Sequence, residues 1–416
     1  MKGRIMKRGI FVTGLIIGIV ILLSSHVMAQ KGKVHIGKLK IIPGLTVQEM
    51  YDDNIYLGSG TNNTTELQES DWITHVMPAL GFNYTFQERG NLTLGYNGNL
   101  AYYRDNVDSD WQTHKGTFDL NYQAPGGLIL GINDVYTDAE DPYSNLEQYR
   151  LGLKTERWNN ALKTKIGLDL GNRLKVLAYY NRFKQDYELE RDYTQNYDSS
   201  EFGAGFQLRL LAKTWGFIRY HFGERDYFTH PAGTGVTESN DSDFDWRRVN
   251  AGVTWDTGAK LNGELNFGYQ WKKYVNPTDV YGNRYDDKNT WIAATSVTYA
   301  ATPTTALALG ITRALRESGS NDNRYFEDTG IGINLQQAIL TKFTVTVGGA
   351  YSVNDYNLPV NRPREDDNYN ANVTLDYQIQ DWLTVGAGYR YNRKDSNYVE
   401  NNYTDNQFII SLGASY

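Results

Sequence analysis

The sequence of 416 residues contains no cysteine. This absence excludes a disulfide framework, a cysteine-ligated metal and a lipid-modified cysteine, and it suits an exported bacterial protein. Histidine is also scarce, at six residues, and the His-Glu-x-x-His, Gly-x-Ser-x-Gly and phosphate-loop patterns are missing. We therefore expect no enzyme activity, no cofactor and no metal centre. A Ser-His-Asp site built from distant strands stays open, because geometry alone defines such a site.

Long apolar runs are absent except at the N-terminus. Lys2, Arg4, Lys7 and Arg8 precede an apolar stretch over residues 9–23, and Val27-Met28-Ala29 places small residues where signal peptidase cleaves. Residues 1–29 are thus predicted to be a cleaved secretory signal peptide. The alternative is an N-terminal membrane anchor, which the shortness of the run disfavours because a span needs ~20 residues. No later run reaches ~18 apolar residues, so no helical span is predicted.

The charge balance is acidic and the aromatic content is high. Four of the 41 Lys and Arg lie in the leader, so 37 remain against 48 acidic residues, a net charge of about −11. This balance argues against nucleic acid as a partner. The chain nevertheless has 32 Tyr, 9 Trp and 15 Phe. A transmembrane β-barrel reconciles these features, since its strands alternate lipid-facing apolar residues with polar residues that face the lumen.

Period-two alternation recurs along the chain. Residues 91–103, 261–271 and 383–391 each place apolar or aromatic side chains on one face and mainly small or polar ones on the other. This pattern predicts strands with one apolar face.

The predicted strands are joined alternately by short turns and by long acidic, Asn-rich segments. Eight short turns, a first strand near Lys40–Tyr51 and a terminal strand predict an all-β, closed, antiparallel up-and-down barrel of about 18 strands. An even count returns both termini to the periplasm, where short turns lie in such barrels. The predicted organisation is a signal peptide at 1–29, a short periplasmic segment at 30–39 and the barrel at 40–416. An additional strand at Leu146–Lys154 stays open. The predicted short turns are 87–90, 124–127, 171–173, 212–214, 257–259, 301–303, 340–342 and 380–382, and the predicted long segments are 52–71, 138–156, 229–243, 275–289, 317–327, 357–367 and 394–402.

The C-terminal strand carries the pattern of an assembly signal. Phe408, Ile410, Leu412 and Tyr416 share a predicted lipid face, while the opposite face is polar except for Ile409. A terminal aromatic on such a strand is typical of outer-membrane barrels. We expect it to be recognised by the outer-membrane insertion machinery, and we expect membrane lipid and lipopolysaccharide to surround the barrel. The oligomeric state is left open.

Several strands end in clusters of aromatic and basic residues, such as 179–183, 219–222, 269–274 and 389–393. We interpret them mainly as an interfacial girdle, in which Lys and Arg meet lipopolysaccharide phosphates. The alternative is an aromatic and arginine ladder for passing sugars. The candidates for lining the pore are Arg219, Glu264, Lys272, Asp376 and Arg390. Their mixed charges predict weak ion selectivity.

Two further features have structural and functional interpretations. Pro43 and Pro78 occur on strands expected to be neighbours, where a missing N–H predicts a bulge or bend near the barrel seam. A lateral gate is the alternative. The acidic stretches 241–245 and 365–368 offer oxygen ligands suited to calcium, but we favour solvated carboxylates that share the divalent ions of lipopolysaccharide.

Two segments near the N-terminus resemble a known family. Ile42-Pro43-Gly44-Leu45-Thr46-Val47 with Tyr51-Asp52-Asp53-Asn54-Ile55-Tyr56, followed by residues 76–84, is similar to the opening of a family of outer-membrane β-barrel porins, β-barrel porin 2, whose members often lie in exopolysaccharide and capsule gene clusters. The resemblance implies an outer-membrane pore associated with secretion of an extracellular polysaccharide. As an export channel, the barrel is expected to dock a periplasmic export component. The resemblance implies no catalytic residues, and it gives Asp52-Asp53-Asn54 no role.

Three functions therefore stay open: a channel for polysaccharide export, a general diffusion porin for small solutes, and a non-conducting scaffold or adhesin. About 18 strands enclose a lumen wide enough for water, which favours the first two. Whether the long segment 229–243 folds into the lumen is left open.

Overall fold

A computed structural model describes residues 34–60, 68–86, 89–141, 154–228, 243–255, 260–276, 286–317, 325–356 and 363–416. The predicted signal peptide, the predicted turn 257–259 and the optional strand at 146–154 lie largely or wholly outside these residues. No helix among them is long and apolar enough to cross a membrane. The strands are β1 Val34–Ile36, β2 Leu39–Asp52, β3 Asp71–Thr85, β4 Gly90–Tyr103, β5 Trp111–Gln123, β6 Leu128–Asp141, β7 Thr155–Leu170, β8 Leu174–Tyr187, β9 Tyr197–Leu211, β10 Thr214–Tyr227, β11 Phe244–Trp255, β12 Leu261–Tyr274, β13 Lys288–Thr302, β14 Thr305–Glu317, β15 Tyr325–Ile339, β16 Phe343–Tyr356, β17 Glu365–Gln380, β18 Leu383–Ser396 and β19 Tyr403–Ser415. Three 3-10 helices, η1 Val107–Ser109, η2 Glu190–Gln195 and η3 Val399–Asn401, lie in the connections.

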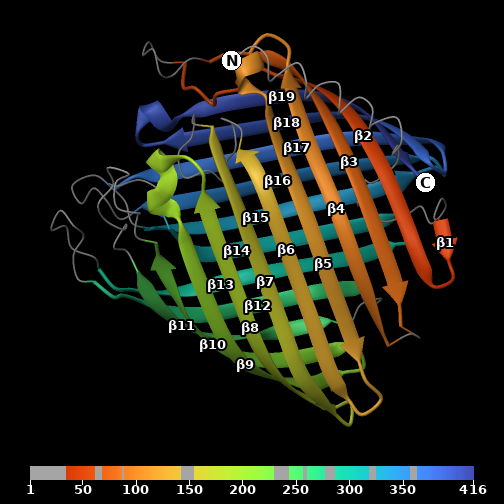
Figure 1. Ribbon diagram of the computed structural model, residues 1–416, viewed down its shortest axis with the longest axis vertical. Coiled ribbons are helices and arrows are strands. Elements are labelled where there is room, and N and C mark those ends of the chain that lie inside the picture. Colours follow the sequence, from red (N-terminus) through yellow and green to blue (C-terminus); the bar gives the residue numbers. More distant parts are fainter. Residues whose placement is uncertain are drawn as a thin grey trace.

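Strands β2 to β19 form a closed barrel of 18 antiparallel strands. Each strand pairs with the next, and β19 closes the wall against β2 from Gln407↔Asp52 to Ser415↔Gly44. Figure 1 shows the inclined strands winding around a single wall, with the far strands crossing behind the near ones. The predicted class and strand number are confirmed. The sequence did not predict β1, which pairs with the start of β2 over Val34↔Ile41 to Ile36↔Leu39.

The alternation of the sequence explains the wall. On β10 the apolar side chains of Ile218, Tyr220 and Phe222 are exposed on the outer face, whereas Phe217 and His221 are buried. Exposed large apolar residues recur in this way around the barrel, forming the surface that a bilayer would cover. The strands of the barrel have 12 to 16 residues, more than the ~9–11 that a bilayer requires, so strand ends project beyond it.

The connections alternate in length as predicted. The turn over 171–173 follows β7, and Gly171 and Asn172 have φ of 66° and 60°, values that Gly and Asn tolerate best. Two long connections absent from the predicted set, 104–110 and 188–196, contain η1 and η2. The strand ends that border the long connections lie at one end of the barrel, which we call the long-loop end.

Two apolar clusters lie inside the barrel near its long-loop end. Met50, Ile55, Ile73, Ala101 and Tyr103 form one buried cluster beside the β19–β2 seam. Ile409, the apolar exception on the polar face of the last strand, packs against this cluster. Its apolar character is therefore explained by inward packing. A second cluster, described below, lies across β9 to β15.

The two prolines of the predicted neighbours occupy special positions in the ladders. The β2–β3 ladder runs through both without a register shift, so the predicted bulge is not formed there. Pro43 lies between the end of the β19 ladder at Gly44 and the start of the β1 ladder at Ile41, where no strand covers that edge of β2. Pro78 instead falls in a gap of the β3–β4 ladder, which pairs Val76 and Ala79 but not the two residues between them. The missing N–H groups are thus placed where the ladders are interrupted.

Candidate functional site

The main candidate site is a cavity of about 1450 Å³ inside the barrel. Its wall takes residues from β5 to β12 and from β14 to β19, many of them near the long-loop ends of those strands. Asn, Gln and Ser side chains contribute to this wall, and so do ten aromatic rings. Nine basic residues line it against the three acids Glu201, Glu317 and Asp328, namely Lys115, Arg157, Arg225, Arg248, Lys272, Arg316, Arg364, Arg393 and Lys394.

The described residues of the cavity wall carry more basic than acidic side chains. Asp366 and Asp395 do not line the cavity, but they pair with lining basic residues. Among the described residues, five acids therefore oppose nine bases, an excess of four positive charges. This local excess is opposite in sign to the net charge of the whole chain. Charge of one sign on the walls of a low-dielectric cleft concentrates counter-ions.

Aromatic and cationic side chains alternate along one part of this wall. The Arg225 guanidinium carbon lies 4.0 Å from the ring centre of Tyr197 and 5.2 Å from that of Phe244. The Lys272 Nζ lies 3.8 Å from the ring centre of Phe244 and 4.4 Å from that of Tyr274. Cations over aromatic faces are attracted by the ring quadrupole. The sequence-predicted cluster at 269–274 is therefore split, with its odd members facing outward and Lys272 and Tyr274 inward.

Lys272 is buried rather than exposed to an aqueous lumen. Its side chain is 1% exposed, and its Nζ forms an ion pair with Glu317 and donates a hydrogen bond of 2.9 Å to the Tyr274 hydroxyl. Tyr227, Phe244, Tyr274 and Tyr325 make up the surrounding apolar cluster. The buried ion pair links β12 to β14 across the intervening strand.

A smaller cavity of about 510 Å³ lies beside a second ion pair. Arg219 on β10 donates from both terminal nitrogens to the two carboxylate oxygens of Glu264 on β12, each at 2.8 Å. Asn250 on the intervening β11 donates to Asn266, which in turn donates to Glu264. This bidentate contact ties three strands together from the lumen side.

Glu201 is a buried carboxylate between the two cavities, and it contacts polar side chains of three neighbouring strands. Its side chain is 8% exposed, and Arg248 Nη2 lies 2.6 Å from it. It also accepts a hydrogen bond of 2.8 Å from the Asn181 amide and lies 3.1 Å from His221 Nδ1. Strands β8 to β11 therefore meet at one carboxylate.

The five residues predicted to line the pore are placed differently from one another. Lys272 and Arg219 contribute to the walls of the larger and smaller cavities, respectively. Glu264 is held by Arg219, and Arg390 donates to Gln407 at 2.9 Å. Asp376 fills the space beside Gly386, where an added Cβ would lie 2.6 Å from its carboxylate oxygen. Their role in conduction stays a prediction.

The acidic stretch 365–368 is tied to basic residues. Asp366 is fully buried, with Arg364 Nη2 at 2.5 Å and Lys394 Nζ at 3.7 Å. Burial disfavours the charged guanidinium of Arg364, but its hydrogen bonds to Asp366 outweigh this effect and raise its pKa above the ordinary value. Asp366 is thus not a solvated carboxylate. In the other stretch, 241 and 242 lie outside the described residues, and Asp243 accepts a hydrogen bond from the Tyr227 N–H.

The residues of the predicted assembly signal all face outward. Phe408, Ile410, Leu412 and Tyr416 are 54%, 62%, 49% and 52% exposed, as a lipid-facing strand requires. Recognition by insertion machinery stays a prediction.

Sequence reasoning missed Arg225, Glu201 and Glu317. Arg225 on β10 and Glu201 on β9 lie at inward-facing positions, and the alternation of the strands is enough to reveal this facing. Which inward residues meet each other depends on barrel curvature and strand stagger, and the alternation contains no signal for either.

The closed antiparallel wall with an apolar outer face and a polar, charged interior defines an outer-membrane type of transmembrane β-barrel. The chain belongs to the family described as "Putative beta-barrel porin 2", whose model matches residues 30–416. This confirms the resemblance found in the sequence. The comparison with curated proteins gives no match.

Solved barrels of similar architecture share little sequence with this chain. OccAB4 of Acinetobacter baumannii is 11% identical, with a TM-score of 0.44 over 90% of this chain and 98% of that one. OpdK of Pseudomonas aeruginosa, solved with vanillate, is 10% identical, with a TM-score of 0.43 over 90% and 99%. The FrpB iron transporter of Neisseria meningitidis is 12% identical, with a TM-score of 0.43 over 85% and 61%. Likeness at this level carries no functional implication.

Proposed function

We propose that this porin-family barrel is a channel through which an extracellular polysaccharide leaves the cell, and that the polymer is anionic. The observation that carries the proposal is the wall of the larger cavity, which combines aromatic rings, amide and hydroxyl groups and an excess of basic side chains. A hydrated sugar chain presents C–H faces to aromatic rings and hydroxyls to amides. Carboxylate, sulfate or phosphate substituents pair with Arg and Lys.

The charge excess supports the anionic part of the proposal. An uncharged polymer gains nothing from four surplus positive charges, whereas an acidic one is drawn into the cavity. The paired residues Lys272 and Arg219 help to hold the wall in shape. We assign attraction of the polymer to the basic lining as a whole, and Lys115 on β5 and Arg157 on β7 are the lining residues chosen to test it.

The proposal includes an orientation. Short turns and both ends of the barrel chain face the periplasm, the signal peptide is removed during export, and a periplasmic export component docks at the short-turn end. The long-loop end then faces outside, surrounded by lipopolysaccharide. No catalytic step is needed for this function.

A general diffusion porin is the second candidate, and the family's porin description favours it. A non-conducting scaffold or adhesin is the third. Secretion assays separate these functions. In a deletion strain, surface polysaccharide should be lost while uptake of small solutes persists, and the wild-type gene should restore it.

A charge-reversal variant tests the lumen itself. Lys115→Glu with Arg157→Glu should leave the barrel folded but reduce polysaccharide export several-fold, because the cavity loses its positive excess. Lys213→Glu, in the exposed turn between β9 and β10, is the control and should export normally. Normal secretion in the deletion strain would contradict the export function and favour the diffusion porin. Equal secretion by all variants would show that the basic lining does not determine polysaccharide export.

A further inference from the structure

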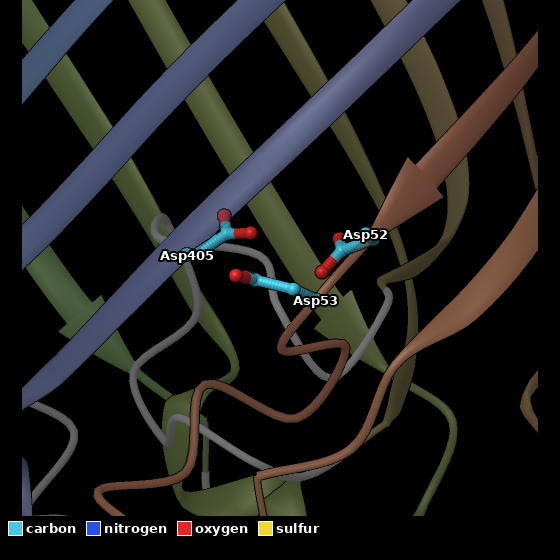
Figure 2. Close-up of side chains that lie close together, drawn as sticks. All are labelled: Asp52, Asp53 and Asp405. Carbon is cyan, nitrogen blue, oxygen red and sulfur yellow. The ribbon is translucent and has the colours of Figure 1, made fainter.

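Three carboxylates converge where the first and last barrel strands meet. Asp52 ends β2, Asp53 follows it, and Asp405 lies near the start of β19. One carboxylate oxygen from each lies within 4.8 Å of the others. Figure 2 shows the three side chains directed toward one another from both sides of the seam.

The loop after β2 is fixed to β19 by hydrogen bonds that set this arrangement. Asp53 accepts hydrogen bonds of 2.7 Å from both the backbone N–H and the side-chain amide of Asn406. The Asn54 amide donates 2.9 Å hydrogen bonds to the carbonyls of Gly58 and Thr404. Asn54 is fully buried. The carboxylates are thus positioned by a rigid local structure.

Two of the three carboxyl groups of this cluster are buried and are held by amide and backbone N–H groups. Asp52 and Asp405 are each 1% exposed. Asp52 accepts from the Asn54 N–H at 2.8 Å and from the Gln407 amide at 3.1 Å. Asp405 Oδ2 accepts from the amides of Asn392 and Gln407. Its buried Oδ1 receives no hydrogen bond from any described group. An unsatisfied buried carboxylate oxygen is strongly destabilising unless something binds it.

Two other buried acids of the barrel are each paired with basic residues. Glu201 has Arg248 and His221 beside it, and Asp366 has Arg364 and Lys394. Within the described part of the chain, no Lys or Arg forms an ion pair with Asp52, Asp53 or Asp405. The seam cluster therefore lacks the basic partner that Glu201 and Asp366 have.

We propose that Asp52, Asp53 and Asp405 bind one calcium ion, which joins the two ends of the barrel. Calcium binds oxygen ligands at about 2.3–2.6 Å, so two ligands on opposite sides of one ion lie about 4.8 Å apart. The three oxygens fit within this span. The orphaned Oδ1 of Asp405 would gain a partner, and a divalent cation would offset most of the three negative charges. This site is independent of what the channel transports.

Direct binding is measured with terbium, a luminescent calcium analogue, added to the full barrel purified in detergent without lipopolysaccharide. Tyrosine-sensitised emission should saturate at one ion per chain and be displaced by calcium. Asp405→Asn should lower terbium affinity at least tenfold. Asp395→Asn at the same end, where a 41% exposed carboxylate pairs with Arg393, is the matched control and should bind terbium as the parent does.

Stability supplies a second readout with a distinctive sign. Calcium should raise the unfolding temperature of the parent barrel relative to EDTA and should have no effect on Asp405→Asn. In EDTA, Asp405→Asn should be at least as stable as the parent, because it removes one of three crowded charges. The proposal is overturned if calcium stabilises parent and variant equally, or if acidification alone stabilises the parent and no terbium binds, since the carboxylates would then share a proton.

Discussion

Removing the charge of Glu317 should destabilise the barrel, because it leaves a buried ammonium without its counter-ion. The Lys272 side chain is 1% exposed and that of Glu317 is 13% exposed. In Glu317→Gln the ammonium keeps the Tyr274 hydroxyl and the face of Phe244. The parent already has both of these contacts, so they do not compensate for the lost carboxylate. Breaking a buried pair costs ~3–5 kcal/mol, and we expect a loss of this size in the free energy of unfolding.

The double variant Lys272→Met with Glu317→Gln should recover most of this loss. Replacing a buried ion pair by apolar groups of similar size is often nearly neutral, so we expect a change of less than about 1 kcal/mol. The assay is urea unfolding of the barrel in lipid vesicles, followed by tryptophan fluorescence and by the gel mobility of the folded form. The exposed pair Arg393–Asp395 serves as the control, and Asp395→Asn should show no measurable loss. A double variant that is less stable than Glu317→Gln would refute the reasoning.

Three further predictions concern orientation, assembly and the long-loop end. A cysteine at Val399, which is 58% exposed in η3, should react with an impermeant maleimide on intact cells, whereas one at Lys213 should not; the reverse pattern would invert the barrel. Leu412→Asp should reduce insertion more than Leu375→Asp, as shown by the amount of heat-modifiable barrel, because both positions face lipid (49% and 45% exposed) but only Leu412 lies on the terminal strand. If both variants lose the same amount of inserted barrel, the loss reflects only the cost of placing a charge against lipid, and the last strand has no special role in assembly. Asp71→Asn should lower stability to urea by about 1–3 kcal/mol, because this buried carboxylate accepts hydrogen bonds from three backbone N–H groups; an unchanged midpoint would contradict this.

Strand number and facing could be predicted from sequence because each depends on local alternation. The period of two fixes which side chains of β10 and β12 face outward, as Tyr220 and Trp271 show by their exposure. Turn positions were predictable to within a residue or two for the same reason. The short strand β1 was not, since three residues are too few to display a period.

Contacts within the lumen could not be predicted, because they join residues distant in the sequence. Asn54 donates to the carbonyl of Thr404, 350 positions away, and Lys272 pairs with Glu317 two strands further on. The motif Asp52-Asp53-Asn54 had no assigned role from sequence for this reason. Its partners are supplied by the last strand once the barrel closes.

The central claim is that the barrel conducts and favours anions, and the reversal potential of the purified protein in a planar bilayer tests it most directly. With a tenfold potassium chloride gradient, the sign of the reversal potential should report chloride preference. Lys115→Glu with Arg157→Glu should shift it toward potassium, because the cavity wall loses its positive excess. A cation preference that the variant does not alter, or no conductance at all, would contradict the account.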